Sequence, residues 1–387
     1  MHKRDRNFLR LVALLVVSAS LNACKVTNPS HQGHIDVQGA NSNAHYRKLD
    51  IQNDAVKNGI FDVSVEYGDD GTGWIAYSRV GLPAYVETGL AKSTNHGESW
   101  QYVLTVNPSI NGHFNDGNET HIGVWRYETP SLLYDPDDHP SHRWKLFTQK
   151  YLSVPPYKKG NSLFQYGQIE YKYASDPKGP WSGPVCLFGS VRNACKVNLA
   201  ALDNSLSNIV FYNEIGTVMV NGVIYLSVDA SPTSSGLGDW EQRKIVLFAS
   251  SDHGETWNYV NTLTSFADAG DFGYLALTGS SLVQEGKHVY LLVTPTGKKG
   301  LFVKNRAHDG VYVIQFDAIG EGKLKRDAKG RLIISKQLNV EPGMHSGGLA
   351  DYDVHNTAGG ILFSQISINK KHRPEFFQVF STGSGLH

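Results

Sequence analysis

The sequence predicts an all-β fold, and three observations support this prediction. Short apolar or alternating runs recur along the chain with turn residues between them, as expected for many strands joined by tight turns. The 39 glycines suit such a fold, because glycine adopts the backbone angles that tight turns need. An eight-residue segment occurs twice, which is typical of a repeat architecture. No long run has the period of an amphipathic helix.

The predicted strands fall into five groups. The clearest strands are Phe61–Glu66, Trp74–Arg79, Ser131–Tyr134, Trp144–Tyr151, Gln168–Ala174, Val223–Asp229, Lys244–Ser250, His288–Thr294, Gly310–Phe316 and Gly360–Gln365. The groups span about residues 61–104, 127–188, 214–263, 274–335 and 347–380. Each has the length of a four-stranded blade, so the sequence predicts a five-bladed β-propeller, or a six-bladed one if the long second group divides. We expect Tyr46–Ile51 to add the closing strand to the fifth group, which removes open edges.

The repeated segment supports the propeller. Ser93–Trp100 and Ser250–Trp257 match at most positions, and Ser175–Trp181 is a shorter, degenerate copy. All three resemble the Asp-box, Ser-x-Asp-x-Gly-x-Thr-Trp, of sialidases and related propellers. Its Asp or Asn caps turn N–H groups, its glycine supplies an unusual backbone angle, and its tryptophan packs beneath the hairpin. The motif therefore implies the fold and does not mark an active site.

The N-terminus indicates an export signal. Residues 1–10 are basic, residues 11–17 are apolar, and small residues lead to Cys24. This order is typical of a secretory signal, and the apolar run is too short to span a bilayer. Residues 21–24 resemble a bacterial lipobox, which implies that Cys24 is lipidated. The alternative is an ordinary signal peptide that contains a cysteine.

We therefore expect three segments in the chain. Residues 1–23 form the lipoprotein signal peptide, residues 24–44 a flexible polar tether, and residues 45–387 the propeller domain. Lys25 follows the cysteine, and by resemblance to enterobacterial sorting this favours the outer membrane of a bacterial cell envelope. The expected membrane contact is through the lipid.

Two further cysteines, Cys186 and Cys195, lie in a chain expected to reach an oxidising compartment. We expect them to form a disulfide that closes a short loop; the alternative is two buried, reduced thiols. No Cys-x-x-Cys pair or His-rich segment lies near them, so we expect no metal there.

The charge balance excludes one class of partner. The chain has 36 basic and 36 acidic residues, which gives no electrostatic footprint for nucleic acid. We expect a monomer whose partner is a carbohydrate, with no cofactor. A central cation such as calcium is the alternative.

The beginnings of the predicted innermost strands indicate where chemistry could occur, because in a propeller they converge on one mouth. Asp62, Glu128 and Glu214 begin the first three groups, and Asp271 lies just before the fourth. Glycoside hydrolysis needs one carboxylic acid to protonate the leaving oxygen and a second carboxylate to attack the sugar or to activate water. A third acid nearby raises the pKa of the proton donor.

This layout resembles glycoside hydrolase families 32 and 43. In those families an Asp of the first blade is the nucleophile or base, and a Glu of a later blade is the acid. The resemblance implies that Asp62 is the nucleophile or base, Glu214 the acid and Glu128 the residue that tunes it. The Asn-Asp-Pro, Arg-Asp-Pro and Glu-Cys-Pro motifs of family 32 and the Asp-Pro opening of family 43 are absent.

Other residues near the predicted mouth are candidates for substrate contact. They are Arg79, Trp125, Arg126, Asp271, Tyr274 and His345. Trp125 could stack on a sugar face or lie buried under a blade. His345 is expected in the wall of the channel. Asp135, Asp137 and Asp138 are expected to form a turn, with calcium binding as the alternative.

Two other functions fit the predicted fold. An exo-sialidase would use three arginines on the substrate carboxylate, for which Arg79, Arg126 and Arg243 are available, with Tyr274 as the nucleophile. The Arg-Ile-Pro signature of sialidases is missing near Asp62. The third hypothesis is a surface propeller that binds glycan or protein without turnover, since the fold does not decide function.

Overall fold

The computed structural model describes residues 45–83, 85–156, 162–189, 195–232, 242–298, 308–341, 344, 346–356, 358–368 and 374–387. The predicted signal and tether, including Cys24, and the candidate His345 lie outside the described residues. None of the described helices is long and apolar enough to cross a membrane.

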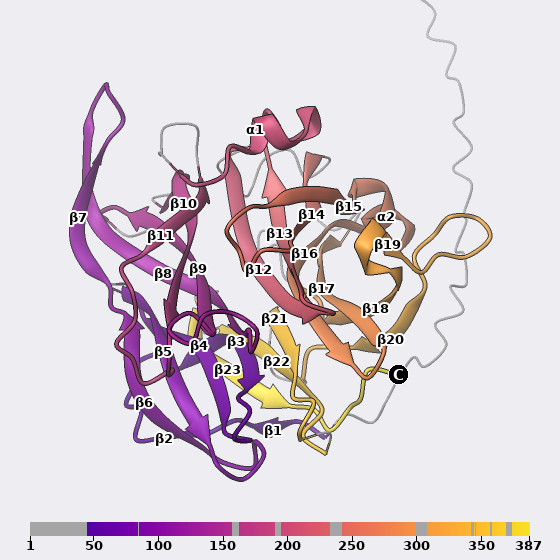
Figure 1. Cartoon of the computed structure of the whole chain (residues 1–387), viewed down its shortest axis with the longest axis horizontal. Coiled ribbons are helices and arrows are strands. Elements are labelled where there is room, and N and C mark those ends of the chain that lie inside the picture. The colour runs from indigo at the N-terminus through magenta and orange to yellow at the C-terminus, as the bar shows by residue number, and fades with distance from the viewer. Residues whose placement is uncertain are drawn as a thin grey trace, which may run out of the picture. The chain divides into compact units, whose positions relative to one another are not determined.

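The described residues form five sheets, arranged as the five blades of a β-propeller (Figure 1). Blade I contains β3 (Ile60–Tyr67), β4 (Gly73–Gly81), β5 (Tyr85–Ser93) and β6 (Trp100–Asn107), and β2 (Ile51–Gln52) runs parallel to β6. Blade II contains β8 (Thr120–Tyr134), β9 (Trp144–Ser153), β10 (Ser162–Ala174) and β11 (Val185–Gly189), and β7 (Ile110–Asn115) pairs with β8. Blade III contains β12 (Phe211–Val220), β13 (Val223–Ser231), β14 (Lys244–Ser250) and β15 (Asn258–Thr264).

Blade IV contains β16 (Tyr274–Glu285), β17 (His288–Lys298) and β18 (Val311–Ala318), with β19 (Lys323–Leu324) and β20 (Ile334–Leu338) both paired to β18. Blade V contains β21 (Ser346–Tyr352), β22 (Ile361–Ile368), β23 (Pro374–Ser381) and β1 (Arg47–Lys48). The short helices are α1 (Leu199–Leu202), α2 (Phe266–Asp271) and the 3-10 turns Asn204–Leu206 and Ile319–Glu321. The all-β, five-bladed prediction is confirmed.

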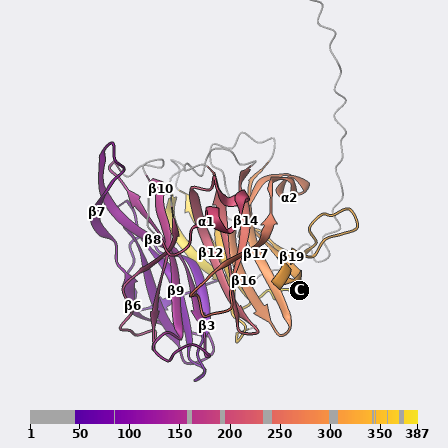
Figure 2. The ribbon, with the colours of Figure 1, turned by 45° about the horizontal axis from the view of Figure 1, so that its top comes forward.

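The long second group is one blade and not two. Its length comes from the long strands β9, of 10 residues, and β10, of 13 residues, which belong to the same sheet. Before this group, β7 and the first part of β8 form a hairpin arm extending beyond the other strands (Figures 1 and 2).

The N-terminal strands close the ring between blades V and I. Arg47 and Lys48 pair with β23 in blade V, as predicted, whereas Ile51 pairs with Trp100 in blade I. The predicted closing strand is therefore divided between two neighbouring blades. This joins the first and last blades and protects the outer edges of both from pairing with other chains.

Five hydrophobic clusters of described residues fill the spaces between neighbouring blades. Between blades II and III, Phe147 and Phe188 pack against Phe248 and Trp257. Because each blade has a neighbour on both faces, its strands are apolar on both sides, which explains the continuous apolar runs in the sequence. This packing fixes the innermost strands around the axis.

The two repeated segments form the same turn between the third and fourth strands of their blades. In Ser93–Trp100 and Ser250–Trp257, the first serine's hydroxyl oxygen accepts the glycine N–H, at 2.9 Å and 2.8 Å respectively. The Asn or Asp side chain accepts the N–H four residues later, at 3.1 Å and 2.8 Å. Trp100 and Trp257 are buried beneath their hairpins.

The predicted disulfide is present. Cys186 in β11 is bonded to Cys195, nine residues later in the segment that precedes α1. The bond closes a short loop on the outer strand of blade II, as the spacing suggested.

Candidate active site

The innermost strand of each blade contains a β-bulge, which lies near the beginning of the strand in β3, β12 and β21 and in the middle of the long strand β8. Register shifts occur in β3 after Phe61, in β8 after Glu128, in β12 after Asn213, in β16 after Thr278 and in β21 after Gly347. Asp62, Thr129 and Glu214 adopt positive φ angles of 49°, 50° and 51° at the first three bulges. For residues other than glycine this conformation is strained by about 1–3 kcal/mol, and such strain concentrates at functional sites.

Asp62 is buried at the first bulge. Its own N–H donates to the Ser364 hydroxyl at 2.9 Å, and the Ser78 hydroxyl donates to its Oδ2 at 3.2 Å. Burial raises the pKa of Asp62 well above its ordinary value, and the carboxylates of Glu128 and Glu214 raise it further. The three carboxyls named from the sequence are therefore brought within electrostatic reach of one another.

Glu214 shares its surroundings with a second acid. Its Oε2 accepts the N–H of Gly279 at 2.7 Å, and its carboxyl is hydrogen-bonded to that of Asp229 on the neighbouring strand β13. Burial raises the pKa of both carboxyls. Arg243 opposes this rise, because its Nε lies 2.9 Å and 2.8 Å from the two Asp229 oxygens. Two carboxyls beside one cation retain one proton between them.

Glu128 is half-buried and lies between cationic and hydroxyl groups. Burial raises its pKa, whereas a hydrogen bond from Tyr151 and the charge of Arg126 lower it. A guanidinium nitrogen of Arg126 donates to the carbonyl of Pro83 in blade I, which links blades I and II. The pKa of Glu128 therefore stays raised, although Tyr151 and Arg126 favour its ionised form.

Several buried polar atoms at the level of the bulges have no hydrogen-bond partner among the described residues. They are Thr129 Oγ1, Gln149 Oε1, Asn213 Oδ1 and Gln365 Nε2. Gln149 lies opposite Glu128 in the β8–β9 ladder, and Asn213 directly precedes Glu214. A buried polar group without a partner costs about 1–3 kcal/mol. The site therefore suits a ligand with many hydroxyl groups, which donate and accept hydrogen bonds.

The other predicted contact residues have varied positions. Arg79 binds Asp54 and Glu87, each at 2.8 Å. The Tyr274 hydroxyl donates to Asp309 at 2.8 Å, and its pKa is raised by burial and by that bond. Asp271 is exposed at the end of α2. Arg243 binds Asp229 in the same way. The arginines of the sialidase hypothesis therefore each lie against acids of this chain.

Trp125 lies on the hairpin arm and is half-buried. A side chain at Gly112, on the facing strand, would come within 2.5 Å of the Trp125 ring, so glycine is needed for the ring to lie across the hairpin. The Lys150 ammonium lies 5.1 Å from the ring centroid, a favourable cation–π distance. Trp125 is therefore held partly by its own blade.

The opposite end of the channel also contains acids. A cavity of about 500 Å³ is lined there by the second halves of the innermost strands. Burial raises the pKa of Glu66 to about 7 and that of Asp351 to about 7. Asp351 accepts the backbone N–H of Val65 at 2.7 Å and that of Tyr352 at 2.8 Å. These acids hold neighbouring strands together.

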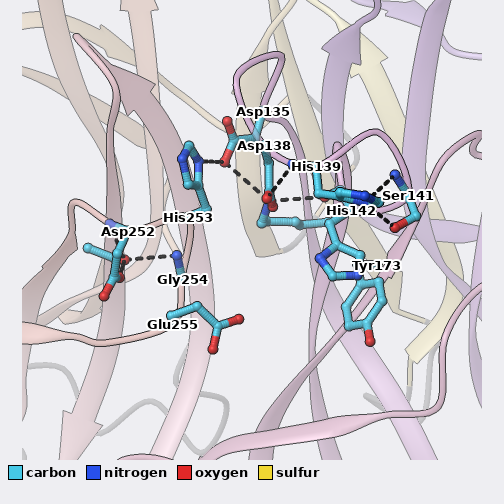
Figure 3. Close-up of polar contacts among 12 residues, drawn as sticks. Asp135, Asp138, His139, Ser141, His142, Tyr173, Asp252, His253, Gly254 and Glu255 are labelled. Carbon is cyan, nitrogen blue, oxygen red and sulfur yellow. Dashed lines mark hydrogen bonds and ion pairs between the residues drawn. The ribbon is translucent and has the colours of Figure 1, made fainter.

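Asp135 and Asp138 form the predicted turn, next to His253 of blade III (Figure 3). Their oxygens and the His253 ring have a spacing that could hold a metal ion. The Lys145 ammonium lies between them, however, 3.1 Å from Asp135 and 2.5 Å from Asp138. His253 Nδ1 is 3.0 Å from Asp135 and links the two blades. The acids of this cluster are thus bound to a cation of the chain itself.

Comparison with known proteins agrees on the fold. No protein-family model matches the sequence, and no curated protein matches it. The catalytic domain of the Coprinopsis cinerea GH62 α-L-arabinofuranosidase aligns over 88% of this chain and 97% of its own, with 9% identity and a TM-score of 0.50. The Bombyx mori GH32 β-fructofuranosidase BmSUC1 aligns over 87% of this chain and 61% of its own, with 12% identity and a TM-score of 0.50. The chain shares their propeller fold. Identities this low establish no reaction.

Sequence reasoning missed four residues that surround the carboxyls. Asp229, Gln149 and Tyr151 lie on second strands, and Arg243, considered above only for a sialidase, is the cation on Asp229. One signal was available for Asp229, because an acid between Val228 and Ala230 interrupts an apolar strand. The others could be found only once the register between first and second strands was known.

Proposed function

We propose that this propeller is a glycoside hydrolase that acts on a glycan or oligosaccharide at the mouth formed by Asp62, Glu128 and Glu214. The observation that carries the proposal is the grouping of three carboxyls from consecutive innermost strands: the charges of Glu128 and Glu214 raise the pKa of Asp62, and that of Glu214 raises the pKa of Glu128. Strained backbone at Asp62 and Glu214 and unpartnered polar atoms at the same level support it.

Glu214 is the proposed general acid. It is hydrogen-bonded to Asp229, and burial raises the pKa of both carboxyls, so the pair holds a proton close to the mouth up to a higher pH than an isolated carboxyl would. Arg243 stabilises the negative charge that remains on the pair after the proton moves to the leaving oxygen. Glu214, Asp229 and Arg243 thus form a proton donor that can take up a new proton after each transfer.

Asp62 is the proposed base or nucleophile, and it must be ionised to act. Its raised pKa opposes ionisation in the free protein. Positive charge develops on the sugar ring in the transition state and favours the Asp62 carboxylate there. An interaction that is stronger in the transition state than in the ground state lowers the barrier. Glu128 is assigned the role of orienting the sugar, and Tyr151 and Arg126 oppose the rise of its pKa and so favour its ionised form.

The experiment that tests the proposal is a screen of the protein on aryl-glycosides and oligosaccharides, including a sialoside. Cleavage of a neutral glycoside that is lost in Asp62→Asn and in Glu214→Gln supports the hydrolase. Cleavage of the sialoside alone would indicate an exo-sialidase. Binding without turnover, weakened by Trp125→Ala and unchanged by Asp62→Asn, would indicate a glycan-binding propeller.

We also propose that the protein is exported and anchored to the bacterial envelope through a lipid on Cys24. The basic, apolar and lipobox-like order of residues 1–24 supports this. Membrane fractionation of the full chain and of Cys24→Ala tests it. The wild type should follow the outer membrane, and the variant should be soluble or retained as precursor. Equal partition of both would contradict the anchor.

A further inference from the structure

A layer of buried polar side chains lies between blades I and II at the level of the candidate site. On blade I, strand register places Ser78, Thr88 and Asn107 side by side on β4, β5 and β6. On blade II, Thr148 and Glu170 face each other on β9 and β10. None of the five residues is more than 2% exposed. Interfaces between blades are otherwise filled by the hydrophobic clusters, so a polar layer at this depth needs a reason.

The two halves of this layer contact each other and reach Asp62. The Asn107 amide donates to the Thr148 hydroxyl across the interface at 3.4 Å. Nearer the axis, the Thr129 N–H donates to the Ser78 hydroxyl oxygen at 3.1 Å. The Ser78 hydroxyl in turn donates to the Asp62 carboxylate at 3.2 Å. The polar layer is thus continuous with the candidate base.

Four atoms of the layer lack a hydrogen-bond partner among the described residues. They are Thr88 Oγ1, Asn107 Oδ1, Thr129 Oγ1 and Glu170 Oε1. They come from neighbouring strands of two facing blades, so they share one region. Buried polar atoms of this kind are normally satisfied by ordered water that makes about 3 hydrogen bonds. Water fits these atoms because it can donate to the amide and carboxylate oxygens and accept from the hydroxyls.

The outer end of the layer reaches solvent. Glu170 Oε2 accepts the amide of Gln168 at 2.9 Å and lies 3.5 Å from the Lys150 ammonium. The Lys150 side chain is 20% exposed, and its ammonium lies over the Trp125 ring. The layer therefore extends from Asp62 to a partly exposed cation.

We propose that a file of water molecules fills this layer and connects the Asp62 carboxyl with bulk solvent at Lys150. The file would exchange protons with Asp62 while a bound substrate covers the mouth. Its role in turnover rests on the proposed hydrolase, whereas the presence of the water does not. Thr88, Asn107 and Glu170 are then positioning residues that act through water on Asp62.

The proton balance of the proposed reaction indicates what the file of water molecules would do. When Asp62 acts as the base, it takes one proton from the attacking water, and Glu214 gives one proton to the leaving oxygen. Before Asp62 can act as the base again, it must release that proton to solvent, and Glu214 must regain one. The file offers Asp62 a route through Ser78 and the water molecules that does not require the products to leave.

A high-resolution crystal structure tests the water directly. We expect ordered water oxygens at about 2.7–3.2 Å from Thr88 Oγ1, Asn107 Oδ1, Thr129 Oγ1 and Glu170 Oε1. A dry layer, in which these side chains bond to one another, would overturn the proposal. A dry layer would not contradict the proposed hydrolase. A hydrated layer in a protein that cleaves no glycoside would contradict the hydrolase and the catalytic role of the water, but not the presence of the water.

Kinetics on a cleaved substrate test the role in turnover. Thr88→Val removes one hydroxyl at constant volume, Thr88→Ser restores it, and Thr264→Val is a matched control at an equally buried position in blade III. We expect kcat to fall about tenfold in Thr88→Val with KM unchanged, a fraction of the ~10²–10⁴ that a positioned acid or base supplies. The solvent deuterium isotope effect should rise as proton transfer becomes limiting.

Thr88→Ser should recover the wild-type kcat, and Thr264→Val should keep it. A fall in kcat that Thr88→Ser does not rescue, or an isotope effect unchanged in Thr88→Val, would show that position 88 supports packing only. Either result would overturn the role of the file in proton exchange.

Discussion

The two ends of the central channel both bury carboxyl groups, but they hold them differently. At the far end, Asp351 accepts backbone N–H groups from two strands, and Glu66 also accepts backbone N–H groups. At the mouth, Asp62 and Glu214 lie on strained backbone, and the charge of Glu214 raises the pKa of Asp62. The far-end acids complete strand pairing, and the mouth acids lie beside unpartnered polar atoms.

This difference shows which properties separate the proposed site from the acids at the far end. Burial raises the pKa of carboxyls at both ends, so a raised pKa alone does not separate function from structure. The separating properties are the left-handed backbone at Asp62 and Glu214 and polar atoms such as Gln149 Oε1 and Asn213 Oδ1. Both depend on the bulges, which turn side chains of the innermost strands toward the mouth.

The largest expected effect is a difference in activity between a variant at the mouth and a variant at the far end of the channel. Glu214→Gln should lower kcat by about 10³-fold, about 4 kcal/mol of barrier, because the amide cannot donate the proton to the leaving oxygen. Asp351→Asn at the far end should leave kcat within about threefold of wild type. Steady-state rates of both variants on one cleaved glycoside check this. Comparable losses in both would mean that the mouth has no special role.

The next effect concerns stability away from the mouth. Lys145→Ala should lower the free energy of unfolding by about 3–5 kcal/mol, because the buried Asp135 and the partly buried Asp138 then lose their cation. Activity measured well below the melting temperature should not change. Chemical denaturation monitored by tryptophan fluorescence gives the stability, with the exposed Lys178→Ala as control. A stable variant that has gained a tightly bound metal would favour the calcium alternative.

A smaller effect concerns the pH dependence of activity. Asp229→Asn removes the acid that shares a proton with Glu214 and leaves the charge of Arg243 uncompensated, so the pKa of Glu214 should fall. Since the general acid must be protonated, the basic limb of the kcat profile should move to lower pH by about one unit. A basic limb that stays in place would exclude the Glu214–Asp229 pair as the proton donor.

The smallest effect is the pH dependence of stability. Glu66 has a folded pKa of about 7 against an ordinary value of 4.5. The folded protein binds the additional proton, so stability should fall as pH rises from about 4.5 to 7. Glu66→Gln should reduce that fall by on the order of 1 kcal/mol. Melting temperatures at about pH 5 and about pH 8 measure it, with Glu255→Gln as an exposed control, and an unreduced fall in Glu66→Gln would contradict the raised pKa.

Sequence patterns predicted much of the fold because its signals are local. Alternating runs, the two repeated turns and the Cys186–Cys195 spacing each depend on residues close together in the chain. The hairpin arm and the divided closing strand were not foreseen, since both depend on which distant strands pair. Strand beginnings predicted the positions of Asp62 and Glu214 for the same local reason, whereas Glu128 lies in the middle of β8, whose first part forms the arm.

The surroundings of those carboxyls could not be predicted from the sequence. Asp229 reaches Glu214 through the β12–β13 register, and Asp54 reaches Arg79 from outside blade I's sheet. Neither contact follows from spacing, because a shift of one residue in register turns a side chain to the other face of the sheet. The catalytic assignment therefore remains a prediction.

The most direct test of the proposed site is a crystal structure of Glu214→Gln with an oligosaccharide that the wild type cleaves. A sugar ring should lie at the mouth, with the scissile oxygen within about 3.2 Å of the substituted amide at position 214, and the Asp62 carboxylate on the other side of the anomeric carbon. Hydroxyl groups of the sugar should bond to Gln149 and Asn213. A sugar found instead in the far-end cavity beside Glu66 and Asp351, with the mouth filled by water, would contradict the account.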